Sequence, residues 1–209
     1  MSDPAPRRRR ADAARNVEHI VLAARELFAE QGARAQLGSI ARHAGVAEAT
    51  LYRHFASKEE LIHAVVERRF DEDVQPVIQN ALRDADPWRA VVAMLGVVPT
   101  VAEVEQGTFA AAGNPAMFLG LASRYFESFA VVLRRAQQAG VVRADLTPED
   151  LPRLTTMLVG AQSLGTDPDT IMAGTALCEG PSGDGWRRYL ALLLDALRPA
   201  AATALPPLR

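Results

Sequence analysis

LGSIARHAGVAEATLYRHFASKEEL, residues 37–61, decides the fold of this chain, because its pattern is that of two short helices joined by a tight turn. Ile40 and Ala44 lie four residues apart on one apolar face of the first helix. Gly45 follows and accepts a left-handed backbone without a Cβ penalty. Leu51 directs the second helix toward the same core. The stretch therefore predicts a helix-turn-helix, whose second helix can lie in the major groove of DNA.

The polar face of the second helix carries side chains that can donate hydrogen bonds to phosphate. Thr50, Tyr52 and His54 lie on it, and Lys58 begins a further helix that Ser57 opens with an S-x-x-E capping box. Free N–H groups at the helix starts favour a phosphate as well. The alternative is an ordinary helical hairpin with a solvated face, which would carry a mixture of Glu and Lys. The pattern favours DNA binding.

An arginine run lies upstream, in MSDPAPRRRRA. The proline-broken, charged composition predicts that residues 1–11 form a disordered basic arm. Such an arm would place Arg7, Arg8, Arg9 and Arg10 in a minor groove or on phosphates. The alternative is a solvated tail that contributes little to binding.

The stretch IARHAGVAEATLYRHFASKEEL resembles the DNA-binding domain of the TetR family of bacterial transcriptional regulators. The family pattern is roughly I-A-x-x-A-G-V-x-x-x-T-[LI]-Y-x-[HY]-F-x-[ST/N]-K-x-x-L. The resemblance implies that base edges are faced by Glu48, Ala49 and Arg53, that phosphates are held by Thr50, Tyr52, His54 and Lys58, and that the core contains Leu51 and Phe55. Gln36 and Ala47 depart from the pattern, because a capping Thr or Ser is usual at both positions, and Ser39 is a substitute. Ser39 and Ala47 complete the expected DNA-binding set.

Charge is distributed unevenly along the 209 residues, of which 49% are hydrophobic. Residues 1–70 hold 12 Lys and Arg against 9 Asp and Glu, whereas the remainder holds 11 against 16. The basic end suits nucleic acid and the acidic remainder does not. A non-specific DNA-packaging protein would be basic along the whole chain, so this class is disfavoured.

No pattern of an enzyme is present, and we expect neither catalysis nor a cofactor or metal. The histidines do not have ligand spacing, and they are His19, His43, His54 and His63. The single cysteine, Cys178, fits a reducing cytosol, and a thiol-based redox sensor is the least favoured alternative. The apolar window 90–102 is too short to span a bilayer. We expect a cytoplasmic protein.

The whole pattern predicts an all-α chain with an N-terminal three-helix DNA-binding domain and a C-terminal helical ligand-binding and dimerisation domain. The expected divisions are an arm at 1–11, the helix-turn-helix domain at 12–56, a linking helix at 57–83, an effector-binding and dimerisation domain at 84–198 and a flexible tail at 199–209. Within them, helices are expected at 12–31, 87–105, 114–139, 148–164 and 186–198, with a loose segment at 107–113 and a short helix near 171–177.

The last helix is apolar on more than half of its circumference, more than one neighbour can cover. The stretch QQAGVVRADLTPEDL also resembles the entry to the dimer-forming helices of TetR regulators. We therefore expect 148–164 and 186–198 to form a four-helix bundle with a second copy of the chain. The candidate interface residues are Leu151, Leu154, Thr155, Leu158, Gln162, Trp186, Tyr189, Leu190, Leu193 and Leu197. The alternative is that one subunit covers both helices fully.

The resemblance also implies an effector pocket among the middle helices. The candidates are Trp88, Met94, Phe109, Met117, Phe118, Arg124, Tyr125, Phe129 and Met157. Ordinary core packing of aromatic and methionine side chains is the alternative. Arg124 lies on a mostly apolar face, where a guanidinium needs an anionic ligand or an internal carboxylate.

These features predict a sequence-specific DNA-binding regulator, a homodimeric repressor released from a pseudo-palindromic operator by an unknown small-molecule effector. The alternative within the same class is a helical DNA-binding protein without a ligand, either constitutive or architectural. Repression rests only on the usual behaviour of the family.

Overall fold

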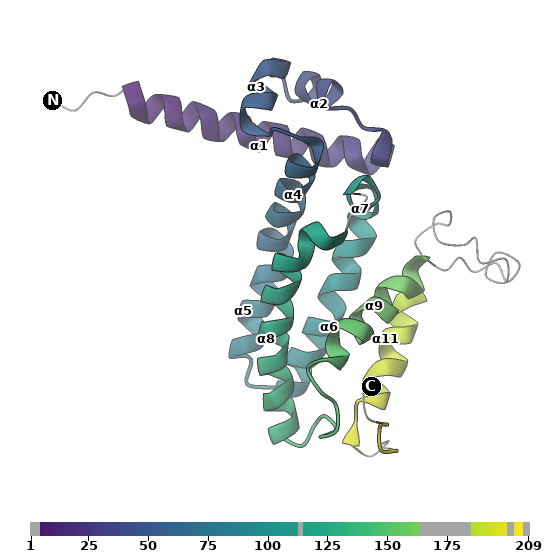
Figure 1. The fold of residues 1–209 in the computed structure, drawn as a ribbon. Coiled ribbons are helices and arrows are strands. Elements are labelled where there is room, and N and C mark those ends of the chain that lie inside the picture. Colours follow the sequence, from purple (N-terminus) through teal and green to yellow (C-terminus); the bar gives the residue numbers. More distant parts are fainter. Residues whose placement is uncertain (1–4, 113–114, 164–184, 200–202, 207–209) are drawn as a thin grey trace, which may run out of the picture. The chain divides into compact units, whose positions relative to one another are not determined.

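The computed structural model describes residues 5–112, 115–163, 185–199 and 203–206, and within them every regular element is helical. The chain divides into two compact units (Figure 1). Unit 1 comprises Met1–Phe70 and Glu105–Leu119, and unit 2 comprises Asp71–Val104 and Gly120–Arg209. The expected all-α class is confirmed. Cys178 and the expected short helix near 171–177 lie outside the described residues.

Unit 1 is built around one long helix. Its elements are α1 (Ala5–Gln31), the 3-10 turn η1 (Gly32–Arg34), α2 (Leu37–His43), α3 (Glu48–His54), α4 (Lys58–Arg69), α7 (Gln106–Ala112) and the 3-10 turn η3 (Pro115–Phe118). Helix α1 contacts α2, α3, α4 and α7 (Figure 1). The shared core includes Ile20, Phe28, Ile40, Leu51 and Leu61, all of them fully buried. Unit 1 is thus a helix-turn-helix held on α1 and α4.

Glycines with positive φ end the first two helices of unit 1. Gly32 has φ of 53° directly after α1, and Gly45 has φ of 70° in the turn between α2 and α3. L residues with a Cβ rarely adopt this conformation, so glycine is required at both turns. Helix α1 begins at Ala5, earlier than the expected start at Asp12. Arginine and alanine are good helix formers, which accounts for the longer helix.

The capping box at the start of α4 is formed. The Ser57 hydroxyl accepts a hydrogen bond from the Glu60 N–H at 3.2 Å, and the Glu60 carboxylate accepts one from the Ala56 N–H at 2.7 Å. These two contacts satisfy backbone donors that the first turn of a helix leaves free. The direction in which α4 leaves the helix-turn-helix is therefore specified locally.

The prediction of a loose segment at 107–113 is wrong for most of that range, because Gln106–Ala112 forms the helix α7. This helix packs so closely on α1 that a Cβ built on Gly107 would lie 2.1 Å from the Phe28 carbonyl oxygen. Two glycines and a run of alanines give no amphipathic pattern, so the sequence shows no sign of this helix. Tertiary packing against α1, α4 and η1 stabilises it instead.

Unit 2 contains the other helices of the described residues. They are α5 (Gln75–Arg83), α6 (Pro87–Val104), α8 (Leu119–Gln138), α9 (Asp150–Ser163) and α11 (Gly185–Ala196). Helix α6 contacts α5, α9 and α11, and α9 contacts α11. A π-helical turn, Phe70–Val74, precedes α5. Pro76 has no N–H to donate to the carbonyl four residues earlier, which accounts for the irregular turn.

Polar side chains close several helix ends in unit 2. The Asp86 carboxylate accepts hydrogen bonds from the N–H groups of Trp88 and Arg89 at 2.9 and 3.1 Å, so it caps α6. At the C-terminal end of α5, the Arg135 guanidinium donates to the carbonyls of Leu82 and Asp84 at 2.8 and 2.6 Å. These contacts hold α8 against the end of α5.

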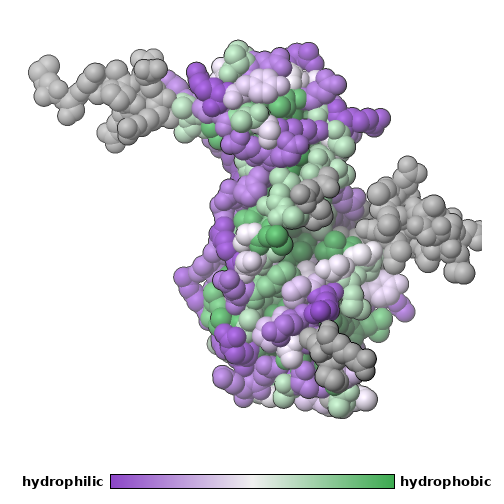
Figure 2. Space-filling view, in the orientation of Figure 1, coloured by the Kyte–Doolittle hydropathy of each residue, from purple (hydrophilic) through white to green (hydrophobic). Residues whose placement is uncertain are grey.

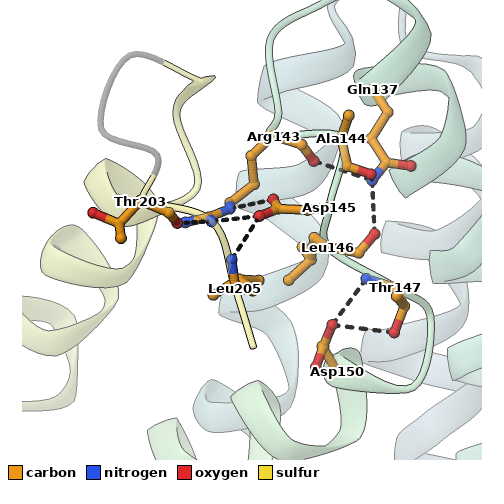
Figure 3. A network of polar contacts seen from close by, with 9 residues as sticks. All are labelled: Gln137, Arg143, Ala144, Asp145, Leu146, Thr147, Asp150, Thr203 and Leu205. Carbon is orange, nitrogen blue, oxygen red and sulfur yellow. Dashed lines mark hydrogen bonds and ion pairs between the residues drawn. The ribbon is translucent and has the colours of Figure 1, made fainter. Parts of the chain in front are cut away.

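The loop between α8 and α9 holds a segment near the C-terminus (Figure 3). The buried Arg143 guanidinium binds both carboxylate oxygens of Asp145, at 2.6 and 2.7 Å. It also donates to the Thr203 carbonyl at 2.5 Å, while the Leu205 N–H donates to Asp145 at 3.0 Å. The pair thus binds one carbonyl and one N–H of the residues at 203–206. Arg143 and the Leu205 amide hold the pKa of Asp145 well below its ordinary value of 3.8.

We expect this pair to make stability depend on pH in the acid range. A carboxyl whose pKa is lowered by folding stabilises the folded state above its unfolded pKa, and this contribution is lost as the pH falls below that value. Asp145→Asn should therefore lower the free energy of unfolding at neutral pH, with a difference from the wild type that shrinks below about pH 4. Urea unfolding across this range measures the difference. Glu127→Gln, at an exposed position on α8, is the control, and a constant difference for Asp145→Asn would contradict the expectation.

Two helices are long and apolar enough to cross a bilayer by length and composition, namely Pro87–Val104 and the stretch Ala116–Gln138. Both are core helices here, because Met94 and Leu95 of the first and Phe129 and Leu133 of the second are almost completely buried. The core helices of soluble proteins meet the same criterion, so the property is weak support for a membrane span.

Candidate nucleic-acid interface

Helix α3 lies on the surface of unit 1 with one face toward solvent. Leu51 and Phe55 are buried and hold the helix on α1, α2 and α4. The outer face is polar or small, and its exposed residues are Glu48, Ala49, Tyr52 and Arg53, with Thr50 and His54 half-buried. Figure 2 shows mostly hydrophilic side chains around the helix-turn-helix. The structure therefore brings together the predicted base-facing and phosphate-holding residues of α3 on one accessible face.

No side chain caps the start of α2 or of α3 in the described part of the structure. Gln36 and Ala47 occupy the N-cap positions in extended conformation, and neither side chain makes a capping hydrogen bond. The first N–H groups of each helix are consequently not satisfied by a side-chain cap. Ser39, the expected substitute, is half-buried, and its hydroxyl accepts a hydrogen bond from Arg42 at 3.3 Å.

Glu48 faces the start of α2. Its carboxylate lies 3.4–3.5 Å from the position that a Cβ on Gly38 would occupy. A carboxylate beside the first turn of a helix interacts favourably with the helix dipole. The side chain therefore holds α3 against α2, in addition to any contact with a base.

Two predicted phosphate ligands have restricted geometry. The Nε2 atom of His54 is buried without a hydrogen-bond partner among the described residues. The Lys58 ammonium donates to the Ala33 carbonyl at 2.7 Å and lies 5.7 Å from the centre of the Phe28 ring. An ammonium has three donors, so Lys58 can keep this contact and still bind a phosphate.

Cations that the sequence analysis did not single out also lie on unit 1. Arg34 on η1 and Arg42 on α2 are exposed. His43, at the end of α2, contacts the Glu26 carboxylate of α1 at 2.6 Å. Isolated arginines in a basic segment give no sequence signal for an interface, and only the folded surface shows them beside α2. Arg7 to Arg10 belong to helix α1, and their side chains are outside the described part of the structure.

Comparison with known proteins agrees with this geometry. Residues 20–65 match the family described as bacterial regulatory proteins, tetR family. The chain is 32% identical over 139 residues to the nucleoid occlusion factor SlmA of Marinobacter nauticus, a match covering 63% of this chain and 71% of that protein. The chain belongs to the TetR family. It is a helix-turn-helix, DNA-binding transcriptional regulator.

Two further proteins are similar to this TetR-family chain. It is 45% identical over 65 residues to the HTH-type transcriptional activator FasR of Mycolicibacterium smegmatis, which is 31% of this chain and 29% of that protein. A crystal structure of a TetR regulator from Mycobacterium vanbaalenii superposes with a TM-score of 0.59 at 27% identity, covering 90% of this chain and 98% of the other. Regulators of this family bind DNA, usually as dimers, and carry ligand-binding C-terminal domains. They are generally not enzymes.

The effector-pocket candidates of this TetR-family protein fall into separate groups. Phe109, Met117 and Phe118 belong to unit 1, where Phe109 and Phe118 make an edge-to-face contact with ring centroids 5.5 Å apart. The members of unit 2 that lie together are Met94, Tyr125 and Phe129, because the Tyr125 hydroxyl donates to the Met94 carbonyl and its ring contacts Phe129. Burial raises the pKa of Tyr125, so the phenol remains protonated.

Other pocket candidates have surface positions. Met157 is 67% exposed, and Trp88 is half-buried beneath the Arg198 guanidinium, 3.6 Å from the ring centre. Arg124 does not lie inside an apolar pocket as the sequence suggested. Its guanidinium is exposed and lies 3.6 Å from the Asp71 carboxylate. The side chain extends past the apolar face of α8 into solvent, so it does not need a buried anion.

The dimer candidates of this TetR-family protein also need correction. Five are buried by their own subunit, namely Leu151, Thr155, Leu158, Trp186 and Leu197. Helices α6, α9 and α11 cover one another, which explains this burial. Tyr189 is 52% exposed, and Leu192, which is not among the predicted interface residues, is 58% exposed. Their spacing of three residues on α11 is the signal that could have identified the pair. The side chain of Gln162 lies outside the described residues.

Proposed function

We propose that this TetR-family protein binds a pseudo-palindromic operator as a homodimer, places α3 of each subunit in the major groove and represses transcription until a small-molecule effector releases it. The observation that carries the proposal is the outward face of α3, where Tyr52 and Arg53 are exposed while Leu51 and Phe55 fasten the helix to the core. A rigidly held helix with a polar outer face is what major-groove recognition requires.

The phosphate contacts follow from the flanking groups. Thr50 and Tyr52 lie on α3, Lys58 opens α4, and no described side chain caps the start of α3. Such contacts fix the register of the protein on the duplex without reading the sequence. Arg53, which projects from the middle of the exposed face, is the candidate for reading a base edge.

The proposed dimer uses the exposed apolar side chains of α9 and α11. Met157, Tyr189 and Leu192 are 67, 52 and 58% exposed on these two helices, which contact each other. Water-exposed side chains of this size lower the free energy when a second copy covers them. Two-fold symmetry would pair α9 and α11 with their counterparts and present two α3 helices to two half-sites.

The proposed effector site is the interior around Met94, Tyr125 and Phe129. These buried side chains come from α6 and α8, and the Tyr125 hydroxyl is a polar group inside an apolar surrounding. A mostly apolar cavity with few polar anchors is the usual form of a small-molecule site. A ligand that weakens DNA binding must itself bind less tightly to the DNA complex, because the coupling is reciprocal.

The decisive experiment is selection of bound fragments from the source genome, followed by a search for small molecules that release them. A recovered pseudo-palindromic sequence with a tight, salt-dependent complex supports the proposal. Protein that retains no fragment even in dilute buffer would refute it. Binding that no molecule releases would favour the constitutive alternative. A reporter gene downstream of the fragment decides between repression and activation, which matters because the relative FasR is named as an activator.

We expect Arg53→Ala to relax base preference at one operator position, with a loss of about 1–3 kcal/mol there if the guanidinium binds guanine. Lys58→Ala should instead weaken binding to all duplexes and reduce the dependence on salt. Fluorescence anisotropy on the operator, on single base-pair variants and on random DNA measures both effects. Equal losses on operator and random DNA for Arg53→Ala would exclude the base-reading role.

A further inference from the structure

Unit 1 contains a buried acidic residue that comes from the middle of the chain. Glu105 follows directly after the last residue of α6, yet it belongs to unit 1 and is only 3% exposed. An ionised carboxylate is retained in such a position only when cations and hydrogen-bond donors surround it. Its partners therefore show what the residue does.

The partners of Glu105 come from three separate helices. The Arg25 guanidinium of α1 lies 2.9 Å from its carboxylate, and the Arg69 guanidinium of α4 lies 3.8 Å away. The Thr108 hydroxyl of α7 donates to the other carboxylate oxygen at 2.8 Å. Glu105 thus connects the helix that supports the helix-turn-helix with the helix that continues from it.

The surrounding packing leaves little freedom at this point. Gly107 brings α7 within contact of the α1 backbone at Phe28, and Phe118 packs against the same core. Arg25 is one-third exposed and Arg69 less so. A displacement of the carboxylate is consequently passed to α1 and α4 rather than absorbed by loose neighbours.

We propose that Glu105 is a positioning residue for DNA recognition: it fixes α1 relative to α4, and thereby the orientation of α3 in the groove. This inference rests on the proposed DNA binding of α3 and extends it to a buried residue of the same unit.

The test compares specific with non-specific binding. Glu105→Gln keeps the size of the side chain and an acceptor for Thr108 but removes the charge that pairs with both arginines. We expect affinity for the selected operator fragment to fall about 5- to 150-fold, the equivalent of a lost base contact. Affinity for a random duplex and its salt dependence should remain unchanged, because the phosphate-binding side chains remain in place.

A purely structural role would give a different result. Destabilisation reduces the fraction of active protein equally for both duplexes, so dissociation constants corrected for active fraction by stoichiometric titration would be those of the wild type. That outcome overturns the inference. Arg25→Gln, at a more exposed partner, should reproduce the loss of selectivity and supplies the test if Glu105→Gln does not fold. Glu30→Gln, at an exposed position on α1, is the matched control and should retain the wild-type ratio.

The proposed DNA recognition by α3 and the proposed role of Glu105 can be refuted separately. If the wild-type protein selects no genomic fragment, DNA recognition by α3 is refuted together with everything that rests on it. If the wild type selects fragments and both Glu105→Gln and Arg25→Gln keep the wild-type ratio of operator to random affinity, only the role of Glu105 is refuted.

Discussion

Leu192→Glu is expected to convert the protein to a monomer and to lower its operator affinity about 10²- to 10⁴-fold. Leu192 is 58% exposed on α11, next to the exposed ring of Tyr189 on the same face. In a two-fold interface each copy contributes the same patch, so one substitution introduces two carboxylates into the seam. A buried charge without a partner is strongly unfavourable, and association should fail.

The loss of affinity follows from linkage of two half-sites. A dimer that has bound one half-site holds its second α3 near the other, and a monomer loses this effective concentration. Light scattering measures the oligomeric state, and fluorescence anisotropy measures affinity for the full operator and for one half-site. Affinity for the half-site should not change.

Ala191→Glu is the matched control for this prediction. Position 191 is exposed on α11 but points away from both the buried face and the face of Tyr189 and Leu192. It adds the same charge to the same helix and should leave the dimer and the operator complex intact. A Leu192→Glu variant that stays dimeric would place the interface elsewhere, and a wild type that is monomeric at micromolar concentration would remove the dimer altogether.

Gly107→Ala is expected to destabilise unit 1 by about 3 kcal/mol or more, a large effect for one methyl group. The added Cβ would lie 2.1 Å from the Phe28 carbonyl oxygen and 2.9 Å from the Ala29 Cα. Both atoms belong to the backbone of α1, so no side-chain rotation can relieve the overlap. Helix α7 must move away from α1, which also disturbs the ion pairs of Glu105.

Urea unfolding and amide hydrogen exchange in α1 and α7 measure this effect. Gly120→Ala is the control, because a Cβ there has no neighbouring atom within 4 Å and the backbone has no positive φ. Alanine is the better helix former, so this control should change stability by no more than about 1 kcal/mol, in the stabilising direction. Similar losses for both variants would mean that helix α7 does not require the close approach at Gly107.

The local features of unit 1 could be predicted because their signals are short in sequence. Gly45 indicates a turn from its own conformational freedom, without reference to distant residues. Its φ of 70° agrees with that prediction. Ser57 and Glu60 cap α4 through neighbouring backbone groups alone. Asp86 before Pro87 likewise marks the start of α6. Each of these depends on a few adjacent residues, so no tertiary information was needed.

Two expectations that the structure does not support required knowledge of what covers a helix. Arg124 was placed on an apolar stripe, yet its long side chain reaches the Asp71 carboxylate at the surface. Leu151 and Leu158 have the periodicity of an interface, but helices of the same subunit bury them. Periodicity shows that a face is buried and does not show whether its partner belongs to the same chain or to a second copy.

The sequence by itself determined that this chain is helical, that a glycine turn near its N-terminal end joins two short helices, and that the second of them carries a polar outer face. Only the tertiary structure decided that residues 105–119, far along the chain, complete the DNA-binding unit. The physical reason is that Gly107 and Glu105 acquire their roles from atoms distant in sequence: the glycine from the α1 backbone at Phe28, and the carboxylate from Arg25 and Arg69. Neither residue has a local pattern, because close packing and buried ion pairs depend on long-range contacts that form only when the chain is folded.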